Sequence, residues 1–305
     1  MRLSRRTLML GGPSAVLVGC APDRTPAAAP PPSTTTVPAR VVSAEAALAA
    51  LETKFGGRLG VYAVDTGDGT AVRHRADERF LMCSTHKALA VSAILRLSAR
   101  QPGLLDRVIH YDRSKLLSYA PVTSQHVADG MTVSELCQAA LTVSDNTAAN
   151  LLVELLGGPT AMTAFVRTLG DPITRMDRLE PDLNVTAPGD ERDTSTPAAM
   201  ATDLRALALG NGLDPAGRDL LVGWMKACAT GGKLIRAGLP VGWQVGDKTG
   251  SGAQGEVDDL AVVWPPGRAP LLIAVYTSPN DRASTAGSAT VASAAAIVAA
   301  ALSPA

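Results

Sequence analysis

Residues 244–277, QVGDKTGSGAQGEVDDLAVVWPPGRAPLLIAVYT, contain three segments with the character of β-strands. The segments cover 244–251, 260–264 and 271–277, and turns that contain glycine or proline separate them. Short segments bounded by such residues are typical of neighbouring strands. This stretch therefore predicts the sheet around which the rest of the chain is arranged.

Two further strands are expected far away in the sequence, at 59–64 and 71–74. Asp68 and Gly69 between them favour the left-handed backbone conformations of a hairpin turn. Ser43 is expected to cap a helix before the first of these strands, because the apolar residues that follow it keep helical spacing.

The segment between the two groups of strands, residues 84–223, carries helical signals. TVSE at 132–135 fits a capping box, and Thr196-Pro197 fits a helix start. Residues 283–305 carry no charge, and we expect a helix packed on the sheet rather than a membrane span, because Ala, Ser and Gly are weakly apolar. This order favours an α/β plus all-α fold, with an antiparallel sheet built from both chain ends, flanking helices and an inserted helical lobe.

The composition limits the kinds of function. The 305 residues carry a formal net charge of +0, with 46% hydrophobic and 3% aromatic residues. A balanced charge argues against nucleic acid as a partner, because phosphate binding needs a basic excess. The apolar content argues against disorder, and 4 cysteines in a chain of this length do not make a disulfide scaffold.

The N-terminal segment has the character of an export signal. Residues 1–19 combine Arg2, Arg5 and Arg6 with a short apolar stretch, and SRRTL at 4–8 resembles a twin-arginine motif. LVGC, which ends at Cys20, resembles the lipobox of bacterial lipoproteins. We therefore expect an exported protein that is lipidated at Cys20.

The region after this cysteine is expected to be a spacer. Residues 20–40 are rich in Pro, Ala and Thr and cannot bury enough apolar surface to fold. A protein lipidated before such a tether would be anchored to the outer face of the cytoplasmic membrane, with partial release as an alternative. Cleavage before Cys20 removes three arginines and no acid, which changes the net charge from +0 to −3.

Four short segments carry residue types suited to acyl transfer. They are Ser84-Thr-His-Lys87, Ser144-Asp-Asn146, Glu180-Pro-Asp-Leu-Asn184 and Lys248-Thr-Gly-Ser251. Residues i and i+3 share a helix face, so the amine of Lys87 can reach the hydroxyl of Ser84 and serve as its base if burial lowers the pKa of the amine. Each segment alone also fits a plain helix, cap, loop or strand end.

Together the segments resemble the motif set of class A serine β-lactamases, S-x-x-K, S-D-N, E-x-x-L-N and K-T-G. Their first residues lie 60, 36 and 68 positions apart, which matches the usual spacing of that family. The resemblance extends from about residue 41 to the C-terminus. It implies the fold shared by β-lactamases and transpeptidases, and β-lactam antibiotics as substrates.

The resemblance also implies roles for individual residues. Ser84 would be the nucleophile, Lys87 or Glu180 the base for acylation, and Glu180 with Asn184 the base and water site for deacylation. Ser144 and Lys248 would pass a proton to the lactam nitrogen. The residues that would contact substrate are Asn146, Tyr119, Thr249, Gly250 and Ser251. The N–H groups of Ser84 and Ser251 would form an oxyanion hole, and Arg178 with Asp193 would clamp the loop that bears Glu180.

The chain departs from this pattern at the substrate carboxylate. The family usually supplies an arginine there, where this chain has Val257. Arg236 and Arg282 are two possible substitutes away from the usual positions.

The cysteines depart from the pattern of some relatives, which join the residue before the nucleophile to a cysteine near position 252. Cys83 has no such partner here, and Cys137 lacks the helix partner of other relatives, at Val91. We expect Cys83, Cys137 and Cys228 to be buried small apolar residues.

Two other functions remain open at this stage. A penicillin-binding D,D-peptidase shares the S-x-x-K and K-T-G motifs but lacks an efficient deacylating base, and a β-lactam sensor module would be acylated without turnover. A zinc hydrolase is not indicated, because His74, His86, His110 and His126 lack metal-ligand spacing. We expect no cofactor and no metal.

The domain organisation follows from these assignments. We expect a monomer with one catalytic domain at 41–305. Its α/β lobe would comprise about 41–75 and 226–305, and its helical lobe about 76–225.

Overall fold

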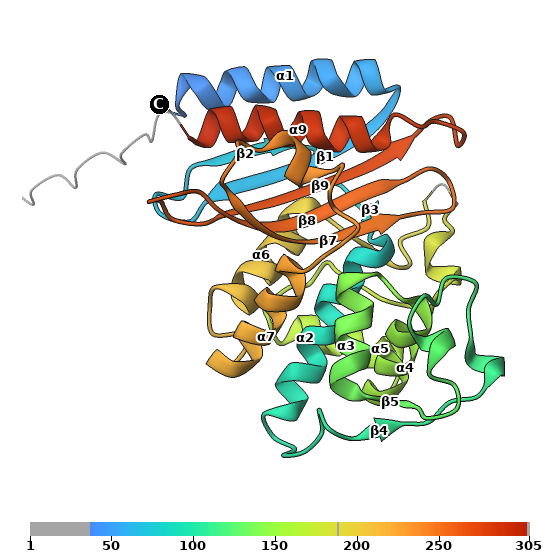
Figure 1. The fold of residues 1–305 in the computed structure, drawn as a ribbon. Coiled ribbons are helices and arrows are strands. Elements are labelled where there is room, and N and C mark those ends of the chain that lie inside the picture. Colours follow the sequence, from blue (N-terminus) through green and yellow to red (C-terminus); the bar gives the residue numbers. More distant parts are fainter. Residues whose placement is uncertain (1–36, 188, 304–305) are drawn as a thin grey trace, which may run out of the picture. The chain divides into compact units, whose positions relative to one another are not determined.

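Five strands form one antiparallel sheet in the computed structural model, which describes residues 37–187 and 189–303 (Figure 1). Their order across the sheet is β2-β1-β9-β8-β7. The bounds are β1 Gly57–Asp65, β2 Ala71–His74, β7 Gln244–Ser251, β8 Val257–Trp264 and β9 Leu271–Pro279. The sheet thus joins both ends of the chain, as predicted, and β7 lies at its edge.

The central strands are apolar on both faces because helices cover both sides. In β9, residues 271–275 are all buried, and Val275 pairs with Val61 of β1 while Ala274 pairs with Leu260 of β8. A strand buried on both faces reads as a continuous apolar run rather than an alternating one. This is why 271–277 was visible in the sequence as a strand.

Two long helices cover one face of the sheet (Figure 1). They are α1 Ala39–Phe55 and α9 Gly287–Leu302. Leu48 of α1 packs with Val291 and Val298 of α9 in one apolar cluster with the sheet. The uncharged C-terminal segment is therefore a helix packed on the sheet, as expected.

Among the described residues no single helix is long and apolar enough to cross a membrane. The helices Asn146–Leu156 and Pro159–Arg167 meet the length and composition criteria together, but only as a bent pair.

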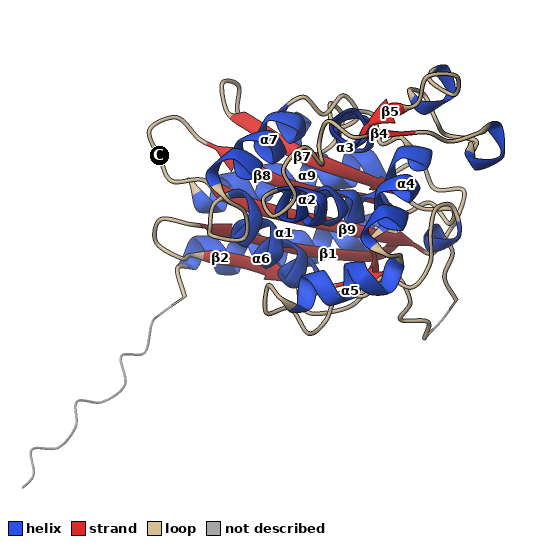
Figure 2. Cartoon of the chain, turned by 90° about the horizontal axis from the view of Figure 1, so that it is seen from below, coloured by secondary structure: helices blue, strands red, loops and turns tan. Residues whose placement is uncertain are grey.

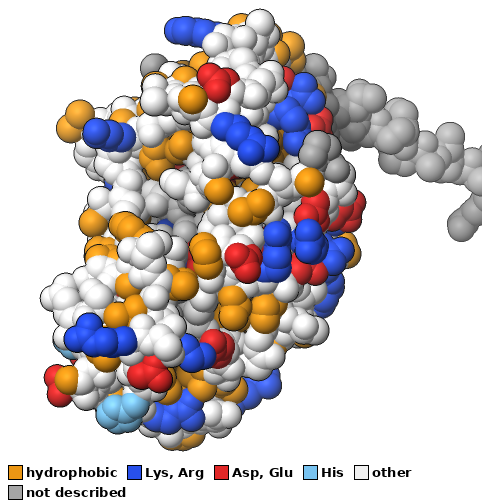
Figure 3. Space-filling model, turned by 90° about the vertical axis from the view of Figure 1, so that its right-hand side faces the viewer, with side chains coloured by type: hydrophobic (Ala, Val, Ile, Leu, Met, Phe, Trp, Pro, Cys, Tyr) orange, Lys and Arg blue, Asp and Glu red, His pale blue; other side chains and the backbone are white. Residues whose placement is uncertain are grey.

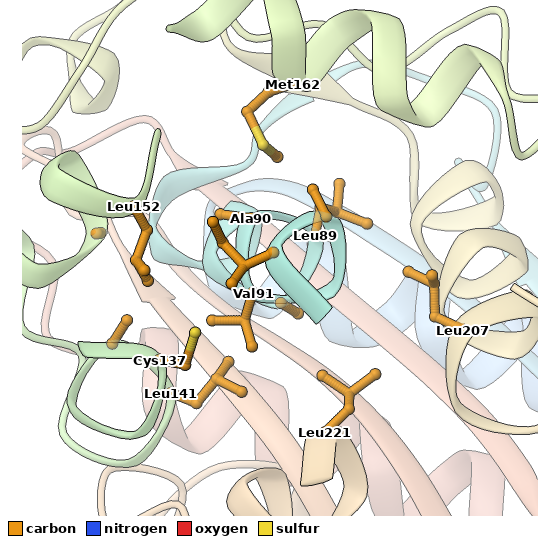
Figure 4. Packing of buried hydrophobic residues seen from close by; sticks show 14 of the residues in the cluster. Leu89, Ala90, Val91, Cys137, Leu141, Leu152, Met162, Leu207 and Leu221 are labelled. Carbon is orange, nitrogen blue, oxygen red and sulfur yellow. The ribbon is translucent and has the colours of Figure 1, made fainter. Parts of the chain in front are cut away.

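The helical part covers the other face of the sheet. Its elements are α2 His86–Ser98, α3 Val133–Thr142, α4 Asn146–Leu156, α5 Pro159–Arg167, α6 Pro197–Ala208 and α7 Pro215–Lys226. The short α8 Ile235–Gly238 instead packs against α9, on the first face. Seen from below, α2 lies at the centre of the other helices (Figure 2). Its residues from His86 to Leu95 are all buried, and Leu89 and Val91 pack among Leu141, Leu152 and Leu207 (Figure 4).

The surrounding helices therefore hold helix α2 rigidly in place. Buried side chains packed at native density leave little room for movement. A residue at the N-terminus of α2 is held firmly relative to the sheet.

Several local predictions are confirmed. Thr132 accepts from the backbone N–H of Glu135, and the Glu135 carboxylate accepts from the N–H of Thr132, which completes the capping box. Thr196 caps α6, with Pro197 at its first position. These caps depend on residues three apart, so the sequence alone reveals them.

Three local predictions are wrong. Helix α1 begins at Ala39, four residues before Ser43, so Ser43 lies inside it. In the hairpin turn only Gly69 has a positive φ, of 77°, and Asp68 does not. Residues 84–223 also contain short strands, β4 Val108–Ile109 paired with β5 Met131–Thr132, and β6 Thr194–Ser195 paired with β3 Phe80–Leu81. Two residues are too few to show a strand period.

Candidate active site

Ser84 lies where a single 3₁₀ turn, Cys83–Thr85, enters α2. Cys83 before it has a φ of +43°, a conformation that L-residues rarely adopt. The Ser84 hydroxyl donates to Glu180 Oε1 at 3.2 Å and accepts from Lys87 Nζ at 3.0 Å. The i, i+3 contact predicted from the sequence is therefore present, and a second basic group lies equally close.

The Lys87 ammonium is fully buried and surrounded by oxygen atoms. Besides Ser84 it lies 2.9 Å from the carbonyl of Ser144, 3.2 Å from the Ser144 hydroxyl, 2.5 Å from Asn146 Oδ1 and 3.2 Å from Glu180 Oε1. A buried charge needs such partners to offset its lost hydration. Lys87 therefore joins the S-x-x-K, S-D-N and E-x-x-L-N segments in one network.

Ser144 links this network to the edge strand. Its hydroxyl accepts from Lys248 Nζ, on β7, at 3.1 Å. Its φ of +61° places both its hydroxyl and its carbonyl toward Lys87. Neighbouring Asp145 is fully buried and accepts from the N–H groups of Val122, Thr123 and Ala148, which anchors this strained turn.

Glu180 is held by the loop that bears it. The Arg178 guanidinium donates to Asp193 Oδ2 at 2.6 Å, and Asp193 Oδ1 also accepts from the backbone N–H of Arg178, so the two ends of the loop are tied together as predicted. Asn150 of α4 bonds both backbone groups of Glu180, at 2.8 and 2.9 Å. Asn184 donates to Glu180 Oε2 at 2.5 Å.

Burial and charge shift the pKa values of three of these groups. Burial lowers the pKa of Lys87, although the Glu180 carboxylate partly offsets this. Burial raises the pKa of Glu180, but Lys87, His86 and the hydrogen bond from Asn184 together outweigh it, and the net shift is downward from 4.5. Burial and the charge of Lys87 lower the pKa of Lys248 to about 8. Glu180 is thus ionised near neutral pH, and both lysines release a proton more readily than usual.

A cleft of about 670 Å³ opens above this network. Its lining residues include Ser84, Tyr119, Ser144, Asn146, Asn184, Thr230, Lys233, Thr249, Ser251 and Val257. The Tyr119 side chain is 49% exposed, while its carbonyl accepts from the Asn146 N–H at 3.0 Å. The cleft is a size that suits a small organic ligand.

Gly250 does not line the cleft, unlike the other residues predicted to contact substrate. A Cβ on Gly250 would lie 3.1 Å from Cys83 Cβ and 3.2 Å from Asp258 Cβ. Close approach of the strand to the turn before Ser84 therefore explains the glycine. Lys87, Glu180 and Lys248 lie just beneath the cleft surface.

Neither proposed arginine reaches the cleft. Arg236 is paired with Asp247, with 2.8 Å from its Nε to Oδ1, and Arg282 is exposed away from the lining. Val257 does line the cleft.

Cys83, Cys137 and Cys228 are free and buried, which confirms their predicted state. Cys20 lies outside the described residues.

Three residues near the site were not predicted from sequence. Asn150 is one turn beyond Asn146 on the same helix face, and this i, i+4 spacing could have indicated it. Thr230 Oγ1 lies 2.6 Å from Thr249 Oγ1, and Lys233 lines the cleft three residues later. Both are on a Gly-rich segment with no periodicity, so nothing in the sequence indicates where their side chains point.

On the face of the molecule drawn in Figure 3, basic and acidic side chains are interspersed.

Comparison with known proteins identifies the family. A model of the β-lactamase enzyme family matches residues 43–302. β-Lactamase AST-1 of Nocardia asteroides is 52% identical over 286 residues, 92% of this chain and 90% of that protein. CTX-M-25 of Escherichia coli is 53% identical over 234 residues, 77% of this chain and 80% of that protein.

The solved structures agree with these sequence matches. A class A β-lactamase from Mycobacterium abscessus has a TM-score of 0.82 and 58% identity, over 84% of this chain and 97% of that one. A β-lactamase from Desulfarculus baarsii has a TM-score of 0.85 and 51% identity, over 87% and 99%. Identity at this level over nearly the whole folded region means that the chain belongs to the β-lactamase enzyme family, in its class A serine branch.

Proposed function

We propose that this chain opens the β-lactam ring of penicillins and cephalosporins through an acyl-enzyme at Ser84 and so confers antibiotic resistance. The observation that carries the proposal is the position of the Ser84 hydroxyl, 3.0 Å from Lys87 Nζ and 3.2 Å from Glu180 Oε1. A serine hydroxyl attacks a carbonyl at neutral pH only when a base takes its proton. Both groups stand within reach of that proton.

In the acylation step the Ser84 oxygen bonds to the lactam carbonyl carbon, and the carbon–nitrogen bond of the ring breaks. The proton leaves Ser84 for Glu180 or for Lys87 in its neutral amine form. The lactam nitrogen gains a proton from Ser144, which regains one from Lys248 or from the protonated Lys87. The Ser144 hydroxyl suits this role because it lies 3.2 Å from Lys87 Nζ and 3.1 Å from Lys248 Nζ. Lys248 releases a proton readily, since burial lowers its pKa to about 8.

In the deacylation step water attacks the ester and Ser84 leaves with a proton. Glu180 takes the proton of the attacking water and Asn184 helps to hold that water. This assignment is supported by the buried carboxylate, whose Oε1 faces Ser84 and whose Oε2 accepts from Asn184. Base catalysis of this kind contributes about 10²–10⁴-fold to a rate.

Turnover separates this function from its two alternatives. Purified protein should hydrolyse many equivalents of a chromogenic cephalosporin, and Ser84→Ala should remove that activity. A burst of one equivalent without turnover would instead indicate a D,D-peptidase or a sensor module. Release of D-alanine from a peptidoglycan peptide then distinguishes those two.

We further propose that Cys20 carries a lipid anchor after removal of residues 1–19, with the protein exported to the outer face of the cytoplasmic membrane. The lipobox-like sequence before Cys20 and the Pro-rich stretch that follows support this proposal. Cys20→Ala should leave an unprocessed precursor and abolish labelling by a radioactive fatty acid. Processing and membrane fractionation unchanged by the substitution would contradict the anchor.

The sequence predicted a catalytic domain at 41–305 after a tether at 20–40. Because α1 already begins at Ala39, we propose 39–305 as the catalytic domain, 20–38 as its tether and the domain itself as a monomer. The residues that line the cleft, from Ser84 to Ser288, all fall within this domain. Light scattering of the processed protein should give the mass of a single chain, and a doubled mass would contradict the monomer.

A further inference from the structure

Penicillins and cephalosporins carry a carboxylate on a ring carbon bonded to the lactam nitrogen. With the carbonyl carbon at Ser84 and the nitrogen at Ser144, the hydroxyls of Thr249 and Ser251 on β7, which also line the cleft, are candidate donors to this carboxylate. An anion bound out of water needs donors or a cation. The question is which group supplies the positive charge, and the inference that follows rests on the proposed function.

No arginine lines the cleft in the part of the chain that the structure describes. Leu234, Val257 and Ser288, which line it, are uncharged. Arg236 is committed to the buried carboxylate of Asp247 and to the carbonyls of Met225 and Lys226. Removing it from Asp247 would leave a buried carboxylate without its cation.

Of the described residues that line the cleft, only Lys233 is basic. Its side chain is exposed, and within residues 37–187 and 189–303 it has no carboxylate within ion-pair distance and no hydrogen-bond partner. Its ammonium is therefore available to a ligand, in contrast to the buried ammonium groups of Lys87 and Lys248.

The backbone that carries Lys233 is fixed on both sides. Before it, the Thr230 hydroxyl bonds the Thr249 hydroxyl of β7 at 2.6 Å. After it, Leu234 is buried and the N–H of Ile235 donates to Asp259 Oδ2 at 3.0 Å. Lys233 is thus carried on an anchored backbone beside the cleft that Thr230 and Thr249 also line.

We propose that Lys233 is the cation that binds the substrate carboxylate, beside the hydroxyls of Thr230 and Thr249. A lysine ammonium is a single point charge on a long stem and lacks the bidentate fork of arginine. Lys233 therefore attracts and holds the carboxylate without orienting it strictly. Its loss should weaken substrate binding much more than it slows the chemical steps.

The test is steady-state kinetics of Lys233→Met with a penicillin and a cephalosporin. KM should rise about tenfold, as for loss of one charged hydrogen bond, with kcat within about twofold of wild type. The difference should shrink at high ionic strength, and Lys233→Arg should restore most of the affinity. Lys54→Met, on the exposed last turn of α1, is the matched control and should change nothing.

A substrate with its carboxylate esterified sharpens the test. Lys233→Met should alter hydrolysis of the methyl ester no more than the control substitution does, since the charge that Lys233 binds is absent. An unchanged KM for the free acid, or an equal effect on acid and ester, would overturn the proposal. So would an Arg282→Met variant that raises KM while Lys233→Met does not. Absence of hydrolysis by the wild type would refute the proposed function instead.

Discussion

A Glu180→Ala variant is expected to react once with a penicillin and then stop, with the opened antibiotic attached to Ser84. Lys87 Nζ lies 3.0 Å from the Ser84 hydroxyl, and removal of the Glu180 carboxylate takes away the larger of the two influences that raise the pKa of Lys87, the other being Asp145. A neutral amine can then take the Ser84 proton, so acylation persists. The hydrolytic water, in contrast, loses its base.

Deacylation should slow by about 10²–10⁴-fold, the usual contribution of a positioned general base. Mass spectrometry of the intact protein should show one added antibiotic on Glu180→Ala within seconds, and none on Glu180→Ala/Ser84→Ala. Glu154→Ala is a suitable control, since that carboxylate lies on the surface and pairs only with Lys115. Turnover of Glu180→Ala at the wild-type rate would remove Glu180 from deacylation.

The secondary structure that surrounds the site was largely predictable. The bounds of β7 and β2 match the predicted segments, with Gly242 before and Gly252 after β7, and Gly69 before β2. The four motifs were also visible, since each places its polar residues within a few positions of one another. A motif of this kind can be recognised from the spacing of its residues in the sequence alone.

Contacts between distant segments were not predictable in the same way. The φ of +61° at Ser144 depends on Asp145, whose carboxylate is held by N–H groups on a loop more than 20 residues earlier. The role of Gly250 depends on the close passage of Cys83. Lys233 lies in a segment without periodicity, and only the fold shows that it lines the cleft. Each of these depends on how two separate segments approach, which no local pattern encodes.

A Lys87→Met variant is expected to lose most of its activity and to shift the pH dependence of what remains. Five oxygen atoms lie within 3.2 Å of the Lys87 nitrogen, among them Ser84 Oγ and Glu180 Oε1. Loss of this group removes one of the two bases beside Ser84. Acylation should fall by about 10²–10⁴-fold, and Glu180 then remains as the base for both steps.

The pH shift follows from the opposing effects on Glu180. In the wild type burial raises the pKa of Glu180, but Lys87, His86 and the hydrogen bond from Asn184 together lower it further, so the carboxylate stays ionised in mildly acidic solution. Without the Lys87 ammonium the balance moves toward burial and the pKa of Glu180 should rise. The acid limb of the pH–rate profile should therefore lie at higher pH in Lys87→Met than in the wild type.

Single-turnover acylation across a pH series measures both effects, with circular dichroism to verify folding. Lys115→Met serves as the control, because Lys115 is exposed and pairs only with the exposed Glu154. An acid limb at the same pH in Lys87→Met as in the wild type would mean that Lys87 does not help to keep Glu180 ionised. Acylation at the wild-type rate would mean that Glu180 alone activates Ser84. The expected outcome instead gives Lys87 two roles, as a base beside Ser84 and as a charge that helps to keep the buried Glu180 carboxylate ionised.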